Sequence, residues 1–443
     1  MRMVLADSRR LRFAAFTAFY FAQGVPIGFL QIALVAWLAG QGATLAETGA
    51  FIGVVTLPWA LKLVSGPFMD RYGIPSMGRR RPWVMATQGG LALSLLSLAV
   101  IPDPTDVAML TMIGFVVMSF AAVQDVAVDG MAIDLLPVDE RGRANAFMAF
   151  GQTVGYAVFS PICGYLLAGF GLPVAALVCA GTVAAIFVLV ALCRERSGER
   201  ALPWTPGRAG APPIAPTNFF GMFPEIFRAL VLPMSLVLIA AEFFARAAGG
   251  VFITAAPVFA VQELGYANTA YTNWYGWLTL VAACIGILFG PAIDRFGGKL
   301  LLGIGIAATA IVSVVFPTLD ALWDEPVFVV GCLAAWLIAS QLVFVAIIAM
   351  FMNLCRKRIA ATQFAIYMSL ANLSRSAGAF LAGAVSAGLT WSENFLLIAG
   401  FAAAALACLA FFSPERHARH LRRLEERETA SGMPRAEARE PAS

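Results

Sequence analysis

The chain has 443 residues, of which 60% are hydrophobic and only 13% are charged, and its mean hydropathy is +0.81. Soluble domains contain about 45–50% apolar and about 25% charged residues, so this composition excludes a soluble single domain, a disordered chain and a disulfide-dense domain. The net charge of +4 is too small to indicate nucleic-acid binding. The only histidines, His417 and His420, lie near the C-terminus, which excludes histidine metal sites and triads from the apolar body. We expect neither a metal nor a cofactor.

Twelve apolar runs are long enough for helices that cross a hydrocarbon core, which takes about 20 residues. They lie at 13–38, 46–66, 82–102, 107–136, 141–170, 172–193, 230–261, 269–291, 299–318, 327–354, 359–389 and 393–412. The first run is too long for a signal peptide and is expected to be an uncleaved anchor. We therefore predict an all-α integral membrane protein with twelve transmembrane helices.

The distribution of basic residues predicts the orientation of these helices. Of the thirty Lys and Arg residues, twenty-seven occupy alternate loops, including the run ends that border them, or the two tails, and the exceptions are Lys62, Arg246 and Arg375. The other six loops contain no basic residue. Because cytoplasmic loops are enriched in Lys and Arg, both termini are predicted to be cytoplasmic and the number of spans to be even.

A charged and then proline-rich segment at 194–229 divides the chain. It predicts a six-helix bundle at 1–193, a cytoplasmic linker at 194–229, a second six-helix bundle at 230–412 and a cytoplasmic tail at 413–443. The end of the linker carries four phenylalanines within reach of one face, which is typical of a short helix at the membrane surface. The alternative is an early start of the seventh span.

Two sequence similarities between the first and second half of the chain indicate an internal repeat. The segment Gly66–Gly73 (GPFMDRYG) recurs as Gly290–Gly297 (GPAIDRFG), 224 residues later. Gln124 in the first half similarly corresponds to Gln341 in the second half, 217 residues later. Two offsets near half the chain length predict two bundles related by an axis along the membrane normal.

The repeated Gly-x-x-x-Asp-Arg-x-Gly pattern resembles that of the major facilitator superfamily, which implies the major facilitator fold. In this interpretation Gly66 allows a close helix approach, and Asp70 pairs with the basic cluster across the cytoplasmic face to latch one conformation. The alternative is a generic positively charged inner loop. The latch candidates are Gly66, Asp70, Arg71, Arg79, Arg80, Gly290, Asp294 and Arg295.

Longer pieces in both halves resemble the AmpG-type permeases. They are Leu61–Leu63, Pro67–Tyr72, Gly78–Arg81, Ala86–Gln88, Gln124–Gly130, Cys355, Ala361–Ala365 and Arg375. The resemblance implies proton-driven import of muropeptides, which are anhydro-disaccharide peptides from cell-wall turnover, across the bacterial inner membrane. The related clan implies alternatives, namely siderophore or acyl-CoA-type transport. A drug exporter is a more distant alternative.

Seven ionisable residues fall inside the predicted spans: Lys62, Asp125, Asp129, Asp134, Glu242, Arg246 and Arg375. A charge at mid-bilayer costs about 2.5–3.5 kcal/mol, so each is expected to face a cavity or a partner. Asp125 and Asp129 are four residues apart and share a helix face. Because two neighbouring carboxylates repel when both are ionised, one of them is expected to hold a proton.

In the absence of membrane histidines, the proton-coupling candidates are Asp125, Asp129 and Glu242, with Asp125 favoured. The alternative is a fixed structural pair between Asp125 or Asp129 and Lys62 or an arginine. Glu242 and Arg246 are also four residues apart, so an intrahelical ion pair competes with a ligand site.

Lys62 and Arg375 have no local partner in the sequence, and each suits a substrate carboxylate or phosphate. Lys62 can instead extend toward the cytoplasm. Amides and aromatic rings suit sugars and peptides, although polar residues in spans also join helices. The substrate-binding candidates are Lys62, Gln124, Arg246, Arg375, Gln23, Trp59, Gln88 and Gln341.

The sequence contains no Walker, HExxH or GxSxG motif, so we expect a transporter and not an enzyme. The leading hypothesis is a monomeric, proton-coupled importer of a large anionic solute that works by alternating access. Its expected partners are the solute, protons and the lipid bilayer.

Overall fold

The computed structural model describes residues 3–72, 74–202, 204–207, 227–355, 360–385, 388–417 and 419–422. The predicted surface helix before Arg228 and the basic cluster at 356–358 therefore lie largely outside the described residues. The first half of the chain contains β1 (Met3–Val4), α1 (Arg9–Pro26), the π-helix η1 (Ile27–Ala33), α2 (Leu34–Gly40), α3 (Leu45–Thr56), α4 (Pro58–Leu61), η2 (Lys62–Val64), α5 (Ser65–Arg71), η3 (Pro75–Met77), α6 (Arg81–Ser97), η4 (Leu98–Val100), α7 (Val107–Leu135), α8 (Val138–Leu192) and β2 (Cys193–Arg194). The second half contains α10 (Pro233–Val258), the π-helix η5 (Phe259–Glu263), α11 (Asn268–Phe296), α12 (Gly298–Thr318), η6 (Asp320–Leu322), α13 (Pro326–Leu354), α14 (Ala360–Val385) and α15 (Trp391–Phe411).

The helix predicted at 46–66 is broken into short pieces. A capping box starts α3, in which Thr44 accepts from the Glu47 backbone N–H and Glu47 bonds back to the Thr44 backbone. Pro58 has no N–H to donate, and the chain passes through α4 and the 3₁₀ turn η2 before α5 begins. This irregular stretch carries Lys62.

The helix α8 is a hairpin of two antiparallel segments that join at Gly171. This glycine has φ 79°, which lies in the left-handed region that other residues avoid. The Sγ atoms of Cys163 and Cys179, on either side of the turn, lie 3.4 Å apart. The predicted runs at 141–170 and 172–193 are therefore separate segments.

Nine helices among the described residues are long and apolar enough to cross a membrane, and one of them contains both segments of α8. The helix α14 and the broken stretch from Leu45 to Arg71 have spanning length but do not meet the same hydropathy or continuity test. The number of twelve spans thus stays a prediction.

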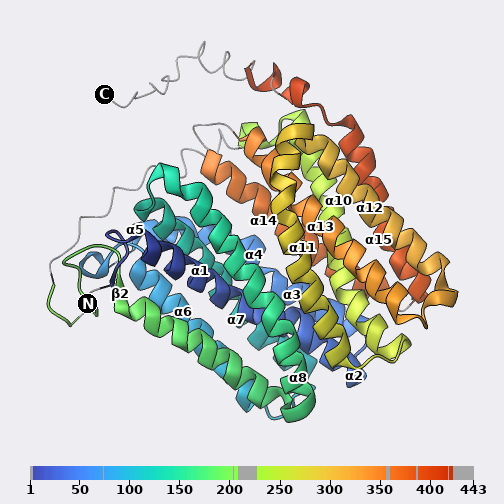
Figure 1. Cartoon of the computed structure of the whole chain (residues 1–443), viewed down its shortest axis with the longest axis horizontal. Helices are drawn as coiled ribbons and strands as arrows, with labels where there is room; N and C mark the ends of the chain where they lie inside the picture. Colours follow the sequence, from blue (N-terminus) through green and yellow to red (C-terminus); the bar gives the residue numbers. More distant parts are fainter. Residues whose placement is uncertain are drawn as a thin grey trace.

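The helices form two groups that lie side by side, coloured blue to green and yellow to red in Figure 1. We call the end where α1 begins and α15 ends the terminal end, and the opposite end the far end. Toward the far end, one hydrophobic core is shared by both halves, as Phe29 and Val251 illustrate. Toward the terminal end, the core splits into one cluster from the first half and another from the second.

Hydrogen bonds between the halves follow the same division. Gln262 on η5 donates to the carbonyls of Ala39 at 2.9 Å and Ala43 at 2.8 Å, at the far end. Deeper in the bundle, the hydroxyls of Thr56 and Ser376 lie 2.8 Å apart. The two halves are thus joined from the far end to mid-depth.

The terminal end of the first half is held together by its own network. The strands β1 and β2 pair in parallel, and Glu195 accepts from the backbone N–H groups of Arg79, Arg80 and Arg81 at 2.5–3.0 Å. The buried Arg81 side chain donates to three carbonyl oxygens, including that of Ala191 at 2.6 Å. These bonds fasten the start of α6 to the end of α8.

Candidate functional site

The first half contains a buried ion pair between two elements. The ammonium of Lys62 on η2 lies 2.5 Å from Oδ2 of Asp125 on α7, and the two side chains are 19% and 6% exposed. The ammonium also lies 5.2 Å from the centre of the Trp59 ring. Lys62 therefore points to Asp125, as in the alternative of an ion pair between these two residues, and does not follow the other alternative of extending toward the cytoplasm.

Asp129 lies one turn along α7 and accepts a short hydrogen bond from the hydroxyl of Tyr20 on α1. Both Asp125 and Asp129 interact electrostatically with Lys62. This group, which we call the acidic site, consists of Tyr20, Lys62, Asp125 and Asp129. It contains two carboxyl groups and one cation.

Two predicted substrate amides lie inside the first half. Gln124 donates to the side-chain oxygen of Gln88 and to the carbonyl of Phe19, and Gln88 donates to the carbonyl of Val183 at 3.2 Å. Both glutamines are completely buried. This placement suits helix–helix hydrogen bonding and gives no direct access to a solute.

In the second half, the predicted intrahelical ion pair forms on α10. Nε of Arg246 lies 2.7 Å from Oε1 of Glu242, and the guanidinium lies 5.0 Å from the centre of the Phe344 ring. The other carboxyl oxygen, Oε2, is buried and has no hydrogen-bond partner among the described residues. Glu242 is 3% exposed and Arg246 is 21% exposed, so the arginine faces open space while the acid is enclosed.

Arg375 on α14 reaches across to the first half. Its Nη2 donates to Oε1 of Gln31 on the π-helix η1 at 3.2 Å. Arg246, Tyr156 and Tyr275 act on it electrostatically. This group, which we call the basic site, consists of Glu242, Arg246 and Arg375 and contains two cations and one acid.

The remaining predicted binding residues are packed against neighbouring helices. Oε1 of Gln23 accepts from Gln152 at 3.0 Å, while the Nε2 of Gln23 is buried without a hydrogen-bond partner among the described residues. Gln341 on α13 packs against Gly286 on α11, where an added Cβ would lie 3.0 Å from its side chain. The carbonyl of Trp59 accepts from Asn372 of the second half at 3.4 Å.

The predicted latch residues lie at the terminal end. Arg79 and Arg80 form ion pairs with Asp134 of their own half, at 3.6 and 3.4 Å. Arg71 lies against the Tyr72 ring, and Arg295 lies against the Phe296 ring. Asp294 lies near the end of α11, and the side chain of Asp70 falls outside the described residues. The ion pairs described here brace one half.

The glycines of the latch motif do not mediate a close helix contact in this structure. Among the described residues, an added Cβ at Gly66 would find its nearest neighbour at 3.9 Å, in Val126, and at Gly290 it would find nothing within 4 Å. The prediction of a close approach at Gly66 is therefore wrong here. By contrast, Gly151 and Gly155 on α8 do contact the α1 backbone directly, at Thr17 and Phe21.

Two tyrosines that act electrostatically on Arg375 were not singled out as binding candidates from the sequence. Tyr156 donates to Thr279 at 3.4 Å across the halves, and Tyr275 lies beside Arg375 electrostatically. The four-residue spacing of Tyr271 and Tyr275 on one helix face was the available signal. Among the described residues, no cluster of His, Cys, Asp and Glu could hold a metal ion.

The two sites lie in different halves of the molecule and differ in the sign of their net charge. When every group is ionised, the acidic site carries an excess negative charge and the basic site an excess positive charge. A carboxyl in excess can take up and release a proton, whereas a guanidinium in excess can bind an anion. Arg375 is well placed for the second task because its contact with Gln31 joins the halves.

Comparisons with known proteins agree with this architecture. The family model of the Major Facilitator Superfamily matches residues 13–379 and 238–441. The chain is 26% identical to the anhydromuropeptide permease of Escherichia coli (strain K12), over 85% of this chain and 74% of that protein. It is 24% identical to the putative transporter AmpG 4 of Rickettsia conorii, over 88% of this chain and 94% of that protein.

Two solved structures have the same fold at low identity. The nucleoside transporter NupG is 12% identical with a TM-score of 0.69, over 90% of this chain and 99% of the NupG chain. A POT family transporter in complex with a thioalcohol-conjugated peptide is 10% identical with a TM-score of 0.67, over 91% of this chain and 96% of the transporter chain.

Proposed function

Because this chain belongs to the Major Facilitator Superfamily, whose relatives named above are membrane transporters, we propose that it imports anhydromuropeptides by proton symport. The observation that carries the proposal is the pairing of an acidic site in one half with a basic site in the other. The similarity to an anhydromuropeptide permease supports the choice of solute.

In this proposal the basic site binds the carboxylates of the peptide portion of the solute. Arg375 is the main anchor because it has no carboxylate partner among the contacts described, whereas Arg246 is already paired with Glu242. The guanidinium suits a carboxylate because it presents parallel N–H donors. Trp59 and Gln341 belong to the proposed binding surface.

The acidic site carries the proton in this proposal. Asp125 holds Lys62, so Asp129 is the carboxyl left without a cation of its own. When one of the two acids is protonated, the other stays ionised and paired with Lys62. We therefore propose that the acidic site takes up a proton together with the solute, with Asp125 and Asp129 acting as a unit and Glu242 as the corresponding acid of the second half.

Alternating access requires two bodies that move relative to each other. We propose that residues 1–193 and 230–412 are these bodies, joined by the linker at 194–229 and followed by the tail at 413–443. The split core at the terminal end supports an arrangement open toward that end. In the bacterial inner membrane, with both termini cytoplasmic, this end faces the cell interior, and a monomer is sufficient for the cycle.

The deciding experiment is uptake into proteoliposomes that contain the purified chain. Labelled anhydro-disaccharide peptide should accumulate when the outside is acidic relative to the inside, and accumulation should stop with a protonophore. An uncharged disaccharide of similar size serves as the matched solute, and it should not accumulate. Uptake of the labelled peptide that is independent of the gradient would refute proton coupling, and absence of uptake would refute the choice of solute.

A further inference from the structure

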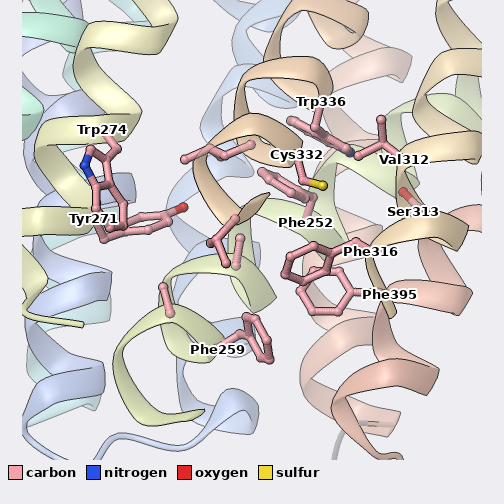
Figure 2. A pocket seen from close by; sticks show the side chains of 14 residues that line it. Phe252, Phe259, Tyr271, Trp274, Val312, Ser313, Phe316, Cys332, Trp336 and Phe395 are labelled. Atoms are coloured by element: carbon pink, nitrogen blue, oxygen red, sulfur yellow. The ribbon is translucent and has the colours of Figure 1, made fainter. Parts of the chain in front are cut away.

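A cavity lies within the second half (Figure 2). Fourteen residues between Phe252 and Phe395 line it, and none of them is charged. They come from α10, η5, α11, α12, α13 and α15. The cavity is therefore lined by residues of the second half.

Half of the lining residues are aromatic. The ring of Phe252 stacks on that of Trp336 at a centroid distance of 3.5 Å, and the ring of Phe316 meets that of Phe395 edge-on at 4.8 Å. The free volume is about 50 Å³. Since one water needs roughly 10–15 Å³ on this measure, the space matches three to five waters or one small ring.

Two polar donors in this wall lack partners. The hydroxyl of Tyr271 and the indole N–H of Trp336 have no hydrogen-bond partner among the described residues. The residues are only 3% and 6% exposed, respectively. Figure 2 shows the Tyr271 hydroxyl pointing from α11 toward the other lining side chains, and the Trp336 ring approaching from α13.

A buried donor without a partner is costly, because it has lost its bonds to water and gained none in return. A purely hydrocarbon wall would suit a dry cavity, but two donors directed at it suit an occupant with an acceptor atom. A charged occupant is disfavoured because no side chain in the wall would balance its charge.

We propose that this cavity is a second binding site, for a small neutral ring compound that carries an acceptor oxygen. The ring packs between the aromatic side chains, and the oxygen accepts from Tyr271, Trp336 or both. The site does not depend on the proposed transport function, because none of its residues belongs to the acidic or the basic site. Most of its lining residues, such as Phe252 and Tyr271, belong to the core that the two halves share at the far end, so an occupant stabilises the joined halves.

The proposal predicts selective binding of a ketone over a hydrocarbon of the same shape. The purified full chain in nanodiscs is titrated with 4-fluoroacetophenone and with 4-fluoroethylbenzene, and binding is followed by fluorine NMR line broadening. The ketone should bind saturably, and Tyr271→Phe should weaken it about three- to tenfold, as expected for one hydrogen bond. Tyr165→Phe, at a half-exposed site in the first half, should bind the ketone as the unmodified chain does.

Labelling of Cys332 gives an independent measurement that needs no variant. This thiol lines the cavity, whereas Cys284 is exposed elsewhere. Methyl methanethiosulfonate forms a disulfide with a thiolate and releases methanesulfinate, and peptide mass spectrometry reports each cysteine separately. The ketone should slow labelling of Cys332 and leave that of Cys284 unchanged. Equal labelling of Cys332 with and without the ketone, or equal binding of the ketone to Tyr271→Phe and the unmodified chain, would overturn the proposal.

Discussion

The two buried charge groups differ in how they are built. In the acidic site the ion pair joins two elements, because Lys62 lies on η2 and Asp125 on α7. In the basic site the ion pair lies within one helix, four residues apart on α10. An interhelical pair can be exchanged when helices shift, whereas an intrahelical pair moves with its helix.

The two sites also differ in the sign of the charge that lies outside the ion pair. Asp129 accepts a hydrogen bond from the hydroxyl of Tyr20, and Arg375 donates one to the amide oxygen of Gln31. The residue with the excess charge in each site is therefore hydrogen-bonded to a neutral side chain. Neutral partners hold a charge less strongly than opposite charges do. The first half is therefore suited to proton exchange and the second to anion binding, and the following variants separate the two.

The largest effect is expected for Asp125→Asn. It leaves the ammonium of Lys62 buried without its carboxylate, and breaking one side of a buried pair costs about 3–5 kcal/mol. We expect a loss of gradient-driven uptake and a lower melting temperature. The double variant Lys62→Gln with Asp125→Asn removes both charges and should recover the melting temperature, but not the uptake. Gradient-driven uptake by the double variant would contradict a coupling role for this pair.

A smaller effect is expected for Arg375→Gln. Hydrogen bonds to charged groups contribute about 1.5–3 kcal/mol, which corresponds to roughly a ten- to hundredfold loss of affinity for the anionic solute. Arg246→Gln is the matched control, and its effect should be smaller because Glu242 already neutralises this arginine. Calorimetric titration of both variants with the solute checks the order. Equal losses would show that the excess charge is not located on Arg375.

Asp129→Asn tests whether this carboxyl group carries the coupled proton. The variant breaks no ion pair, since the amide oxygen of Asn can still accept a hydrogen bond from Tyr20. We expect exchange of labelled for unlabelled solute to continue, while uptake loses its dependence on outside pH. One coupled proton changes the driving force by about 1.36 kcal/mol per pH unit. Asp134→Asn is the control, because that acid pairs with Arg79 and Arg80 at the terminal end. A retained pH dependence in Asp129→Asn would remove this acid from the proton path.

Much of the fold was predictable from the sequence because its signals are local. The apolar runs predicted the helices, and the four-residue spacing of Glu242 and Arg246 indicated their ion pair as one of two alternatives. The partner of Lys62 was harder to predict. Asp125 is 63 residues away, and only packing brings it within 2.5 Å, so the sequence left substrate binding, a structural pair and extension to the surface open.

The errors in the latch region have a similar origin. Gly66 belongs to a motif that predicts a close helix approach, but contact depends on which conformation the halves adopt. In the structure the core is split at that end, and Gly66 meets no close neighbour in the part of the chain that the structure describes. The pairing of Arg79 and Arg80 with Asp134 joins segments that no spacing rule connects.

The smallest effects are expected at the far end, where each half contains one helix that begins with a capping box. Thr44 caps α3 and Thr390 caps α15, and in each case a glutamate three residues on bonds back to the threonine N–H, at 2.8 and 2.7 Å. Thr44→Ala and Thr390→Ala should each cost about 1 kcal/mol and lower the melting temperature equally. Transport should respond unequally, because α3 bonds to the other half through Thr56 and Ser376. Fraying of α3 weakens the contact between the halves at the far end and should change the uptake rate, whereas fraying of α15 should not. Equal uptake rates in the two variants would argue against separation of the halves at the far end during transport.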